Sequence, residues 1–247
     1  MTAGAAPSRR EFLAIGFGWF PLFRNRGQVA LAGARFRILR NGKKPRHHYL
    51  HIHGDEETAR QVLESFMEVH PGVAFLIENK TRNVSIMSGE LDPNRMFSRE
   101  GAEVNLKTLN PTWTYPQIDN ALDILDHGRD RLVNAFLPPK GGLLVALHNN
   151  TEAYSVNDEV PISDSTSLRQ PSDPHAFFIC TDPADFRVLQ TSPYNVVLQQ
   201  KKPQQDDGSL SRLAAARAVR YINLEVERGN ATRQAEMLEW LNTNLAG

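Results

Sequence analysis

The sequence predicts an α/β fold, in which one domain carries a mixed, mostly parallel sheet of about eight strands with helices on both faces. Short apolar runs rich in β-branched residues alternate along the chain with segments of helical periodicity. That alternation is typical of three-layer domains, where helices cover both faces of a sheet. The run over residues 142–147 is apolar throughout, as expected of a strand buried on both faces. A length of 247 residues suits one sizeable domain of this kind.

The first half of the chain contains predicted strands and helices separated by turn signals. Apolar and basic residues alternate over residues 34–39, which predicts a strand, and Asn41-Gly42 then marks a turn. Apolar residues recur at helical spacing from residue 56 to the stop signal His70-Pro71-Gly72. The strands expected in this half cover residues 34–39, 47–52, 73–77 and 83–87, and the helices cover residues 56–69 and 116–137.

The second half continues the same alternation. Pro138-Pro139 ends the long helix, and the buried strand over residues 142–147 follows. Residues 157–174 are rich in Ser, Asp and Pro, and we expect a long surface loop that could serve as a lid or a specificity loop. The other loops are expected at residues 88–100 and 203–208, the other strands at residues 176–180, 195–198 and 221–226, and the other helices at residues 183–190, 210–219 and 231–245.

The composition excludes several classes of protein. Lys+Arg and Asp+Glu both number 28, so the formal net charge is zero and no basic field indicates a nucleic-acid partner. The single cysteine, Cys180, excludes an internal disulfide and a zinc site made only of cysteines. Cys180 lies in an apolar run and is expected to be a small core residue. A metal site in this chain must therefore use histidines and carboxylates.

The N-terminal residues resemble an export signal. Ser8-Arg9-Arg10-Glu11-Phe12-Leu13 is similar to the twin-arginine signal of bacterial export, and an apolar run follows over residues 12–23. That run is too short to span a bilayer. Ala30-Leu31-Ala32 is a candidate cleavage site, so we expect a signal peptide over residues 1–32, a catalytic domain over residues 33–247 and a periplasmic location. The alternative is a disordered basic tail on a cytoplasmic protein.

Three short motifs carry the chemical signal. His53 and Glu56 form His-x-x-Glu at the end of the predicted strand over residues 47–52. A strand end followed by a turn can aim an imidazole and a carboxylate at one point, and Zn²⁺ accepts both as ligands. The second motif is Asp92-Pro93-Asn94-Arg95, and the third is Leu147-His148-Asn149-Asn150-Thr151, at the end of the buried strand. Ligands of such sheets bind at the carboxyl ends of the strands.

Together and in this order, the three motifs resemble those of the zinc carboxypeptidase superfamily, and most closely its aspartoacylase and succinylglutamate desuccinylase branch. The resemblance implies that His53, Glu56 and His148 hold one Zn²⁺ per chain, with the fourth position left for water. It also implies a glutamate on a late strand that carries protons during the reaction. We assign that role to Glu225, with Glu227 as its competitor on the same strand face.

The resemblance also implies residues that bind the substrate. Asn94 and Arg95 would hold a substrate carboxylate, for which the planar fork of arginine is suited. Arg82 would support the developing oxyanion. A tyrosine would also lie near the substrate, and Tyr154 and Tyr194 are both candidates, between which the sequence does not choose. Many aspartoacylase relatives have an Asp before Leu-His, whereas this chain has Ala146 at that position. The hydrogen bonding around His148 is therefore expected to differ.

The predicted function is zinc-dependent hydrolysis of an amide bond in a small molecule or peptide that carries a free carboxylate. Export favours a peptide, whereas the motifs favour an N-acyl amino acid, and the sequence leaves both open. Two alternatives also remain, namely a non-catalytic zinc-binding or ligand-binding relative that kept the fold and an esterase that uses the same site. We expect neither a nucleic-acid partner nor a stable membrane span after processing.

Overall fold

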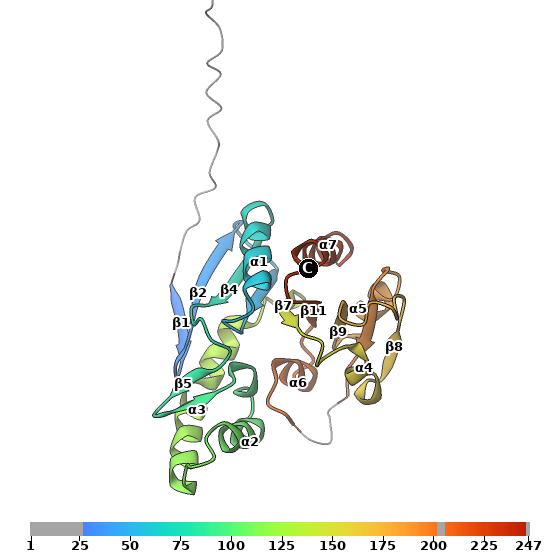
Figure 1. Cartoon of the computed structure of the whole chain (residues 1–247). Helices are drawn as coiled ribbons and strands as arrows, with labels where there is room; N and C mark the ends of the chain where they lie inside the picture. Colours follow the sequence, from blue (N-terminus) through green and yellow to red (C-terminus); the bar gives the residue numbers. More distant parts are fainter. Residues whose placement is uncertain (1–26, 202–205, 246–247) are drawn as a thin grey trace, which may run out of the picture.

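A computed structural model gives the arrangement of the chain, and it describes residues 27–201 and 206–245 (Figure 1). The twin-arginine motif and the apolar run that follows it lie outside the described residues. Within the described ranges, no helix combines the length and the apolar character needed to cross a membrane.

A nine-stranded mixed sheet forms the centre of the molecule, in the order β1-β2-β4-β3-β7-β11-β9-β10-β8. The four strands β4, β3, β7 and β11 run parallel to their neighbours in this central group. Antiparallel pairs flank them at β1–β2, β2–β4, β11–β9 and β10–β8, while β9 and β10 are parallel. The strands are β1 Gln28–Leu31, β2 Ala34–Asn41, β3 His47–His51, β4 Gly72–Ile77, β7 Leu143–Asn150, β8 Ser165–Ser167, β9 Phe177–Cys180, β10 Asn195–Leu198 and β11 Tyr221–Glu227.

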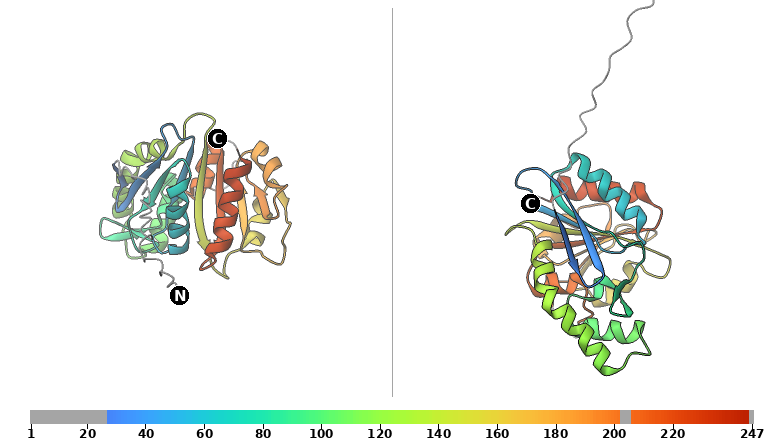
Figure 2. Two further views of the ribbon diagram at one scale, coloured as in Figure 1. Left: turned by 90° about the horizontal axis from the view of Figure 1, so that it is seen from above. Right: turned by 90° about the vertical axis from the view of Figure 1, so that its left-hand side faces the viewer.

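Helices cover both faces of the sheet. Along β7, Leu144 and Ala146 pack into the apolar core beneath one helix layer, whereas Val145 and Leu147 pack into the core beneath the other. The right-hand view of Figure 2 shows the sheet between α1 and α7 on one side and α3 on the other. The helices on one face are α1 Glu57–Val69, α5 Pro183–Leu189 and α7 Ala231–Asn244, and those on the other are α2 Arg99–Leu109, α3 Tyr115–Phe136 and α6 Leu210–Ala216. The predicted three-layer α/β class is confirmed.

Two of the three predicted loops contain regular structure that their composition did not indicate. Residues 88–100 hold β6 Gly89–Leu91, which pairs with β5 Val84–Ile86 in a separate hairpin, and a 3₁₀ turn, Pro93–Arg95. They also hold the start of α2, which buries only Gly101, Ala102 and Leu106, too few residues for a clear helical period. Residues 157–174 hold most of α4 Val156–Glu159, a 3₁₀ turn Val160–Ile162 and the polar edge strand β8.

The strand register brings the predicted site residues together. Because β3 and β7 are parallel neighbours, the His53 turn follows β3 beside the carboxyl half of β7. The strand predicted over residues 142–147 is longer than expected, since β7 continues to Asn150 along the ladder with β11. In that ladder Glu225 is the direct partner of His148. A candidate metal ligand and a candidate proton carrier thus become neighbours although 77 residues apart in sequence, the difference between 225 and 148.

Two of the three residues of the candidate cleavage site are part of the sheet. Ala30 and Leu31 lie in β1, which pairs with β2, and Leu31 is buried in the core. The export signal and the two-part division of the chain stay predictions.

Candidate metal centre

Three buried side chains converge on one point. The ligand atoms that His53, Glu56 and His148 offer all lie within 4.8 Å of one another. His53 Nδ1 is 2.8 Å from Glu56 Oε1, and His148 Nδ1 is 3.3 Å from Glu56 Oε2. That second contact has the distance of an ion pair but leaves the buried Oε2 without a hydrogen bond. Two imidazole nitrogens and a carboxylate with an unsatisfied oxygen are a donor set that fits Zn²⁺.

The turn between β3 and α1 positions the first two of these side chains. The chain leaves β3 after His51, and the Glu56 amide donates to the His53 carbonyl at 3.3 Å, which closes a tight turn. Gly54 lies against another part of the chain, where a Cβ would come within 2.2 Å of the Asn79 carbonyl oxygen. Glu56 immediately precedes the first helical residue, and its side chain contacts that of His53 across the turn.

The charges in the centre support one another. Burial disfavours the charged form of His53, but Glu56 and Asp92 outweigh it and raise the pKa of His53 to about 9. Burial also opposes ionisation of Glu56, yet His53 and His148 hold the pKa of this carboxyl well below its usual range. A carboxylate that stays ionised at this depth can serve as a ligand for a metal cation once the histidines lose their protons.

Asp92 orients His53 from behind. Its Oδ1 lies 2.9 Å from His53 Nε2 and also accepts the backbone N–H of Asn94 at 2.8 Å. The contacts to His53 and Arg82 outweigh the effect of burial and lower the pKa of Asp92. The ring of His53 is thereby fixed with Nδ1 toward Glu56, the arrangement by which carboxylates commonly support metal-binding histidines. The sequence analysis quoted Asp92 as part of a motif but gave it no role.

Glu225 is the buried acid beside the centre. Its two oxygens accept hydrogen bonds from the side-chain amides of Asn223, at 3.0 Å, and Asn150, at 3.3 Å. Burial raises the pKa of Glu225, and the nearby charge of Glu56 adds to this effect while His148 opposes it. Glu227 is exposed at the end of β11. The structure therefore brings Glu225 rather than Glu227 to the centre.

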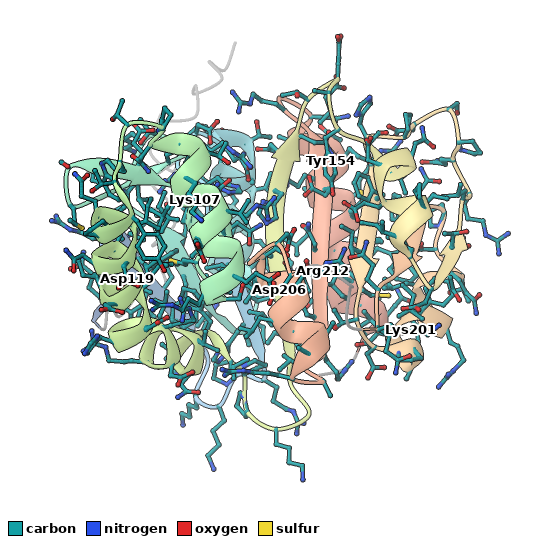
Figure 3. The ribbon with its side chains drawn as sticks, turned by 90° about the horizontal axis from the view of Figure 1, so that it is seen from below. Lys107, Asp119, Tyr154, Lys201, Asp206 and Arg212 are labelled. Carbon is teal, nitrogen blue, oxygen red and sulfur yellow. The ribbon has the colours of Figure 1, made fainter. Side chains whose placement is uncertain are left out.

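A cavity of about 520 Å³ opens next to the centre. Tyr154 contributes to its wall, whereas Tyr194 is buried in the apolar core with the Arg233 guanidinium over its ring. Figure 3 shows Tyr154 in the segment after β7 and Arg212 on α6. All eight residues predicted for the site line this cavity, namely His53, Glu56, Arg82, Asn94, Arg95, His148, Tyr154 and Glu225.

The predicted substrate-binding residues already have partners. Arg82 is half exposed and lies 3.3 Å from Glu56 Oε1, and Arg95 pairs with Asp207 at 3.3 Å. The side-chain oxygen of Asn94 accepts the backbone N–H of Leu210 at 3.0 Å, which ties it to the start of α6. Such partly exposed ion pairs are weak and can exchange for a ligand.

The cavity also contains residues that sequence analysis missed. Arg212 lines the wall, and no carboxylate in the described part of the chain pairs with its guanidinium. Arg228 lies on another side and pairs with Asp55 at 2.8 Å. No motif marks these residues, because helix α6 and the end of β11 reach the cavity only through the tertiary fold.

The support of His148 differs from that of His53. The His148 carbonyl accepts a hydrogen bond from Gln234 Nε2 at 2.9 Å, and Gln234 Oε1 accepts one from Asn149 at 3.0 Å. Asn149 in turn accepts the backbone N–H of Ala59 at 2.8 Å. This network links β7 to helices α1 and α7. Ala146 led us to expect different hydrogen bonding around His148, and in this structure that bonding involves Gln234 and Asn149.

No family model and no curated protein matches the chain. Three crystal structures of proposed metallopeptidases are similar to it. The protein from Shewanella denitrificans OS217 has 10% identity and a TM-score of 0.42, with 87% of this chain and 82% of that chain covered. The protein from Shewanella baltica OS155 has 13% identity and a TM-score of 0.44, with 91% and 86% covered. The protein from Shewanella amazonensis SB2B has 12% identity and a TM-score of 0.42, with 88% and 86% covered. These values are too low to establish a shared reaction, so the chemistry of this chain rests on its own residues.

Proposed function

We propose that this protein is a zinc-dependent hydrolase that cleaves an amide bond in a substrate with a free carboxylate. One observation carries the proposal: three buried ligand atoms within 4.8 Å of one another lie beside the buried acid Glu225, at the wall of a cavity. His53, Glu56 and His148 would hold the metal. When bound, Zn²⁺ activates a water molecule near neutral pH and polarises the carbonyl under attack.

Glu225 would move protons between water and the leaving amine. Its raised pKa brings it closer to the pH at which a carboxyl can both accept and return a proton. The amides of Asn150 and Asn223 fix both oxygens without supplying a full charge, so the group keeps the capacity to accept a proton. The register of β11 with β7 holds it beside His148.

Arg82, Asn94 and Arg95 would position the substrate. The guanidinium of Arg82 lies next to Glu56, where it can interact with the oxygen of the bound carbonyl as negative charge develops. Asn94 and Arg95 sit side by side on the cavity wall and suit a carboxylate. A volume of about 520 Å³ fits an acylated amino acid or a short peptide. A periplasmic peptide is the substrate that the predicted export would favour.

Metal content and turnover test the proposal together. Wild type, His53→Ala, Glu225→Gln and the exposed control Glu227→Gln are compared for bound zinc and for hydrolysis of a panel of N-acyl amino acids and dipeptides. We expect about one zinc in wild type, its loss in His53→Ala, and zinc retention with a roughly 10²–10⁴-fold lower kcat in Glu225→Gln. Glu227→Gln should behave as wild type.

A wild-type protein that binds no zinc after incubation with the metal at neutral pH contradicts the proposal. Zinc binding without turnover on any member of the panel assigns the chain to the non-catalytic metal-binding alternative instead.

A further inference from the structure

We infer that Glu159 forms a binding site for a positively charged group of the substrate, in the same cavity as the metal centre. The inference rests on the proposed function, because it names the kind of substrate that the proposed site would accept. Glu159 is the last residue of α4, in the segment that the sequence analysis expected to be a loop, and it lines the cavity together with Tyr154.

The Glu159 carboxylate is held in a fixed orientation. The Tyr154 hydroxyl donates to its Oε1 at 2.5 Å, and the side-chain amide of Gln199 donates to its Oε2. Gln199 is itself 3% exposed, and Ser163 donates to the Glu159 backbone carbonyl at 2.8 Å. A carboxylate held by a buried amide and a phenol has lost much of its rotational freedom, so a ligand would have less entropy to pay when it binds there.

Both donors to Glu159 are neutral, which leaves its charge uncompensated. Within residues 27–201 and 206–245, no Lys, Arg or His nitrogen lies within 4.0 Å of this carboxylate. By contrast, the cavity residues Asp55 and Asp207 pair with arginines, and Glu56 contacts two histidines. A partly buried negative charge without a counter-ion is costly, and a ligand cation would remove that cost.

The surroundings of Glu159 favour a cation at the end of an apolar chain. Ile162 and Ile179 line the cavity as well, and the Tyr154 ring packs against Phe177 with centroids 5.7 Å apart. An aliphatic stem would lie against these groups while its ammonium or guanidinium group reaches Glu159. A structural role alone would not need the charge, since a neutral acceptor could take both hydrogen bonds at lower desolvation cost.

The cavity therefore offers charges of both signs. Arg95 and Arg212 favour a substrate carboxylate, and among the described residues no carboxylate pairs with the Arg212 guanidinium. Glu159 favours a cation. The substrate class inferred is an acyl amino acid or short peptide that carries a carboxylate and a basic side chain or free amino group. Charge pairing at both ends would align the amide bond between them with the metal centre.

Two matched ligand pairs test the inference by calorimetry on zinc-loaded protein, in a Glu225→Gln background that slows turnover. Nα-acetyl-lysine is compared with Nα-acetyl-norleucine, which lacks only the ammonium group. Glycyl-alanine, whose free amino group lies on the other side of the amide bond, is compared with acetyl-alanine, which lacks that group. We expect the cationic member of at least one pair to bind at least about tenfold more tightly, as for a charge-assisted hydrogen bond.

Glu159→Gln should remove this preference and keep the affinity for the neutral member. The control Glu152→Gln removes an exposed carboxylate of the same segment that does not line the cavity, and it should keep the preference. Thermal unfolding curves verify that both variants are folded. If Glu159→Gln does not fold, the inference is judged on the parent protein. Tighter binding of the cationic ligand, by a margin that decreases with added salt, would support the inference, and equal affinities would contradict it.

Equal affinities within both pairs, no binding of any ligand, or a preference that persists in Glu159→Gln would overturn the inference. Its failure is distinct from failure of the proposed function. A protein that hydrolyses neutral acyl amino acids without a charge preference disproves only the cation site, whereas a preference in binding without any wild-type hydrolysis disproves only the reaction.

Discussion

At the scale of single residues, His53 connects the two carboxylates of the candidate metal centre. Its Nδ1 faces Glu56 at 2.8 Å and its Nε2 faces Asp92 at 2.9 Å, so the ring is held at both nitrogens. Because Nδ1 is the ring nitrogen that faces Glu56, Asp92 at Nε2 would support a metal-binding His53 rather than act as a ligand itself. The ring orientation thus depends on a residue 39 positions away in sequence.

Asp92→Asn should weaken zinc binding without abolishing it. The amide oxygen can still accept from His53, but it lacks the charge that makes the imidazole a stronger ligand, so we expect an affinity about 10–100-fold lower. Competition with a chromophoric chelator measures this change. An affinity equal to that of wild type would show that Asp92 does not support the centre.

His51 should make stability depend on pH. It is fully buried, its Nε2 contacts the Glu56 carbonyl at 2.9 Å and its Nδ1 has no hydrogen-bond partner. Burial lowers the pKa of His51 to about 4, from 6.5 in the unfolded chain. As the pH falls below 6.5, the unfolded chain takes up the proton first, so stability is lost progressively between pH 6.5 and pH 4, by up to roughly 3 kcal/mol.

Urea unfolding with a chelator present, at pH 7 and near pH 4, measures this loss. His51→Gln keeps a donor to the Glu56 carbonyl but cannot be protonated, so its stability should fall less than that of wild type over the same interval. Equal losses in the two proteins would exclude His51 as the cause.

At the scale of elements, the turn from β3 into α1 decides whether His53 and Glu56 meet. The turn is tight because Gly54 packs against the backbone of residues 79–81, which lie beyond β4. Glycine is required here for space, since the distance from a Cβ to the Asn79 carbonyl carbon would be 2.6 Å. Backbone atoms cannot move aside as a flexible side chain can, so any larger residue must displace the turn.

Gly54→Ala should therefore lower the free energy of unfolding by more than about 2 kcal/mol and reduce zinc binding. Gly229→Ala is the matched control, because a Cβ there meets nothing within 4 Å and only the positive φ of 91° is strained. We expect the control to lose about 1 kcal/mol and to keep its zinc. Urea unfolding and metal analysis of the two variants provide the comparison, and equal effects would argue against the packing role of Gly54.

At the scale of the whole molecule, the site depends on strands from the middle of the sheet. The residues that line the cavity extend from His53 to Arg228, and they come from β7, β9 and β11, from the turn after β3 and from other helices and turns. Neither half of the chain contains all three candidate ligands and the candidate proton carrier. The edge strand β1, in contrast, lies four strands away from β7 in the sheet order and contributes nothing to the cavity.

A chain that lacks residues 1–32, as cleavage after Ala32 would produce, should be less stable but still bind zinc. It loses β1 and the buried side chain of Leu31, which we expect to cost about 3 kcal/mol. Urea unfolding and metal analysis of the full and shortened chains measure both properties. Loss of zinc from a folded shortened chain would show that β1 supports the site across the sheet.

The amino-acid sequence by itself determined the α/β class, most strands and helices, and the three residues that could hold a metal. Hydrophobic periodicity indicates which face of an element is buried, and the His-x-x-Glu spacing indicates that two side chains come from one turn. Both patterns depend on residues that are close in sequence, so they can be recognised without the fold. The polar helix α2 and the edge strand β8 escaped detection because they bury few apolar residues.

The tertiary structure alone decided which distant residues meet. The contacts of Asp92 with His53, of Glu225 with Asn150 and of Glu159 with Gln199 join residues 39, 75 and 40 positions apart. Such contacts depend on the order of the strands in the sheet and on their register, which no local pattern encodes. The tertiary structure also determines which of the two glutamates of β11 lies beside the candidate metal centre. The strand is buried at Glu225 and exposed to solvent at Glu227.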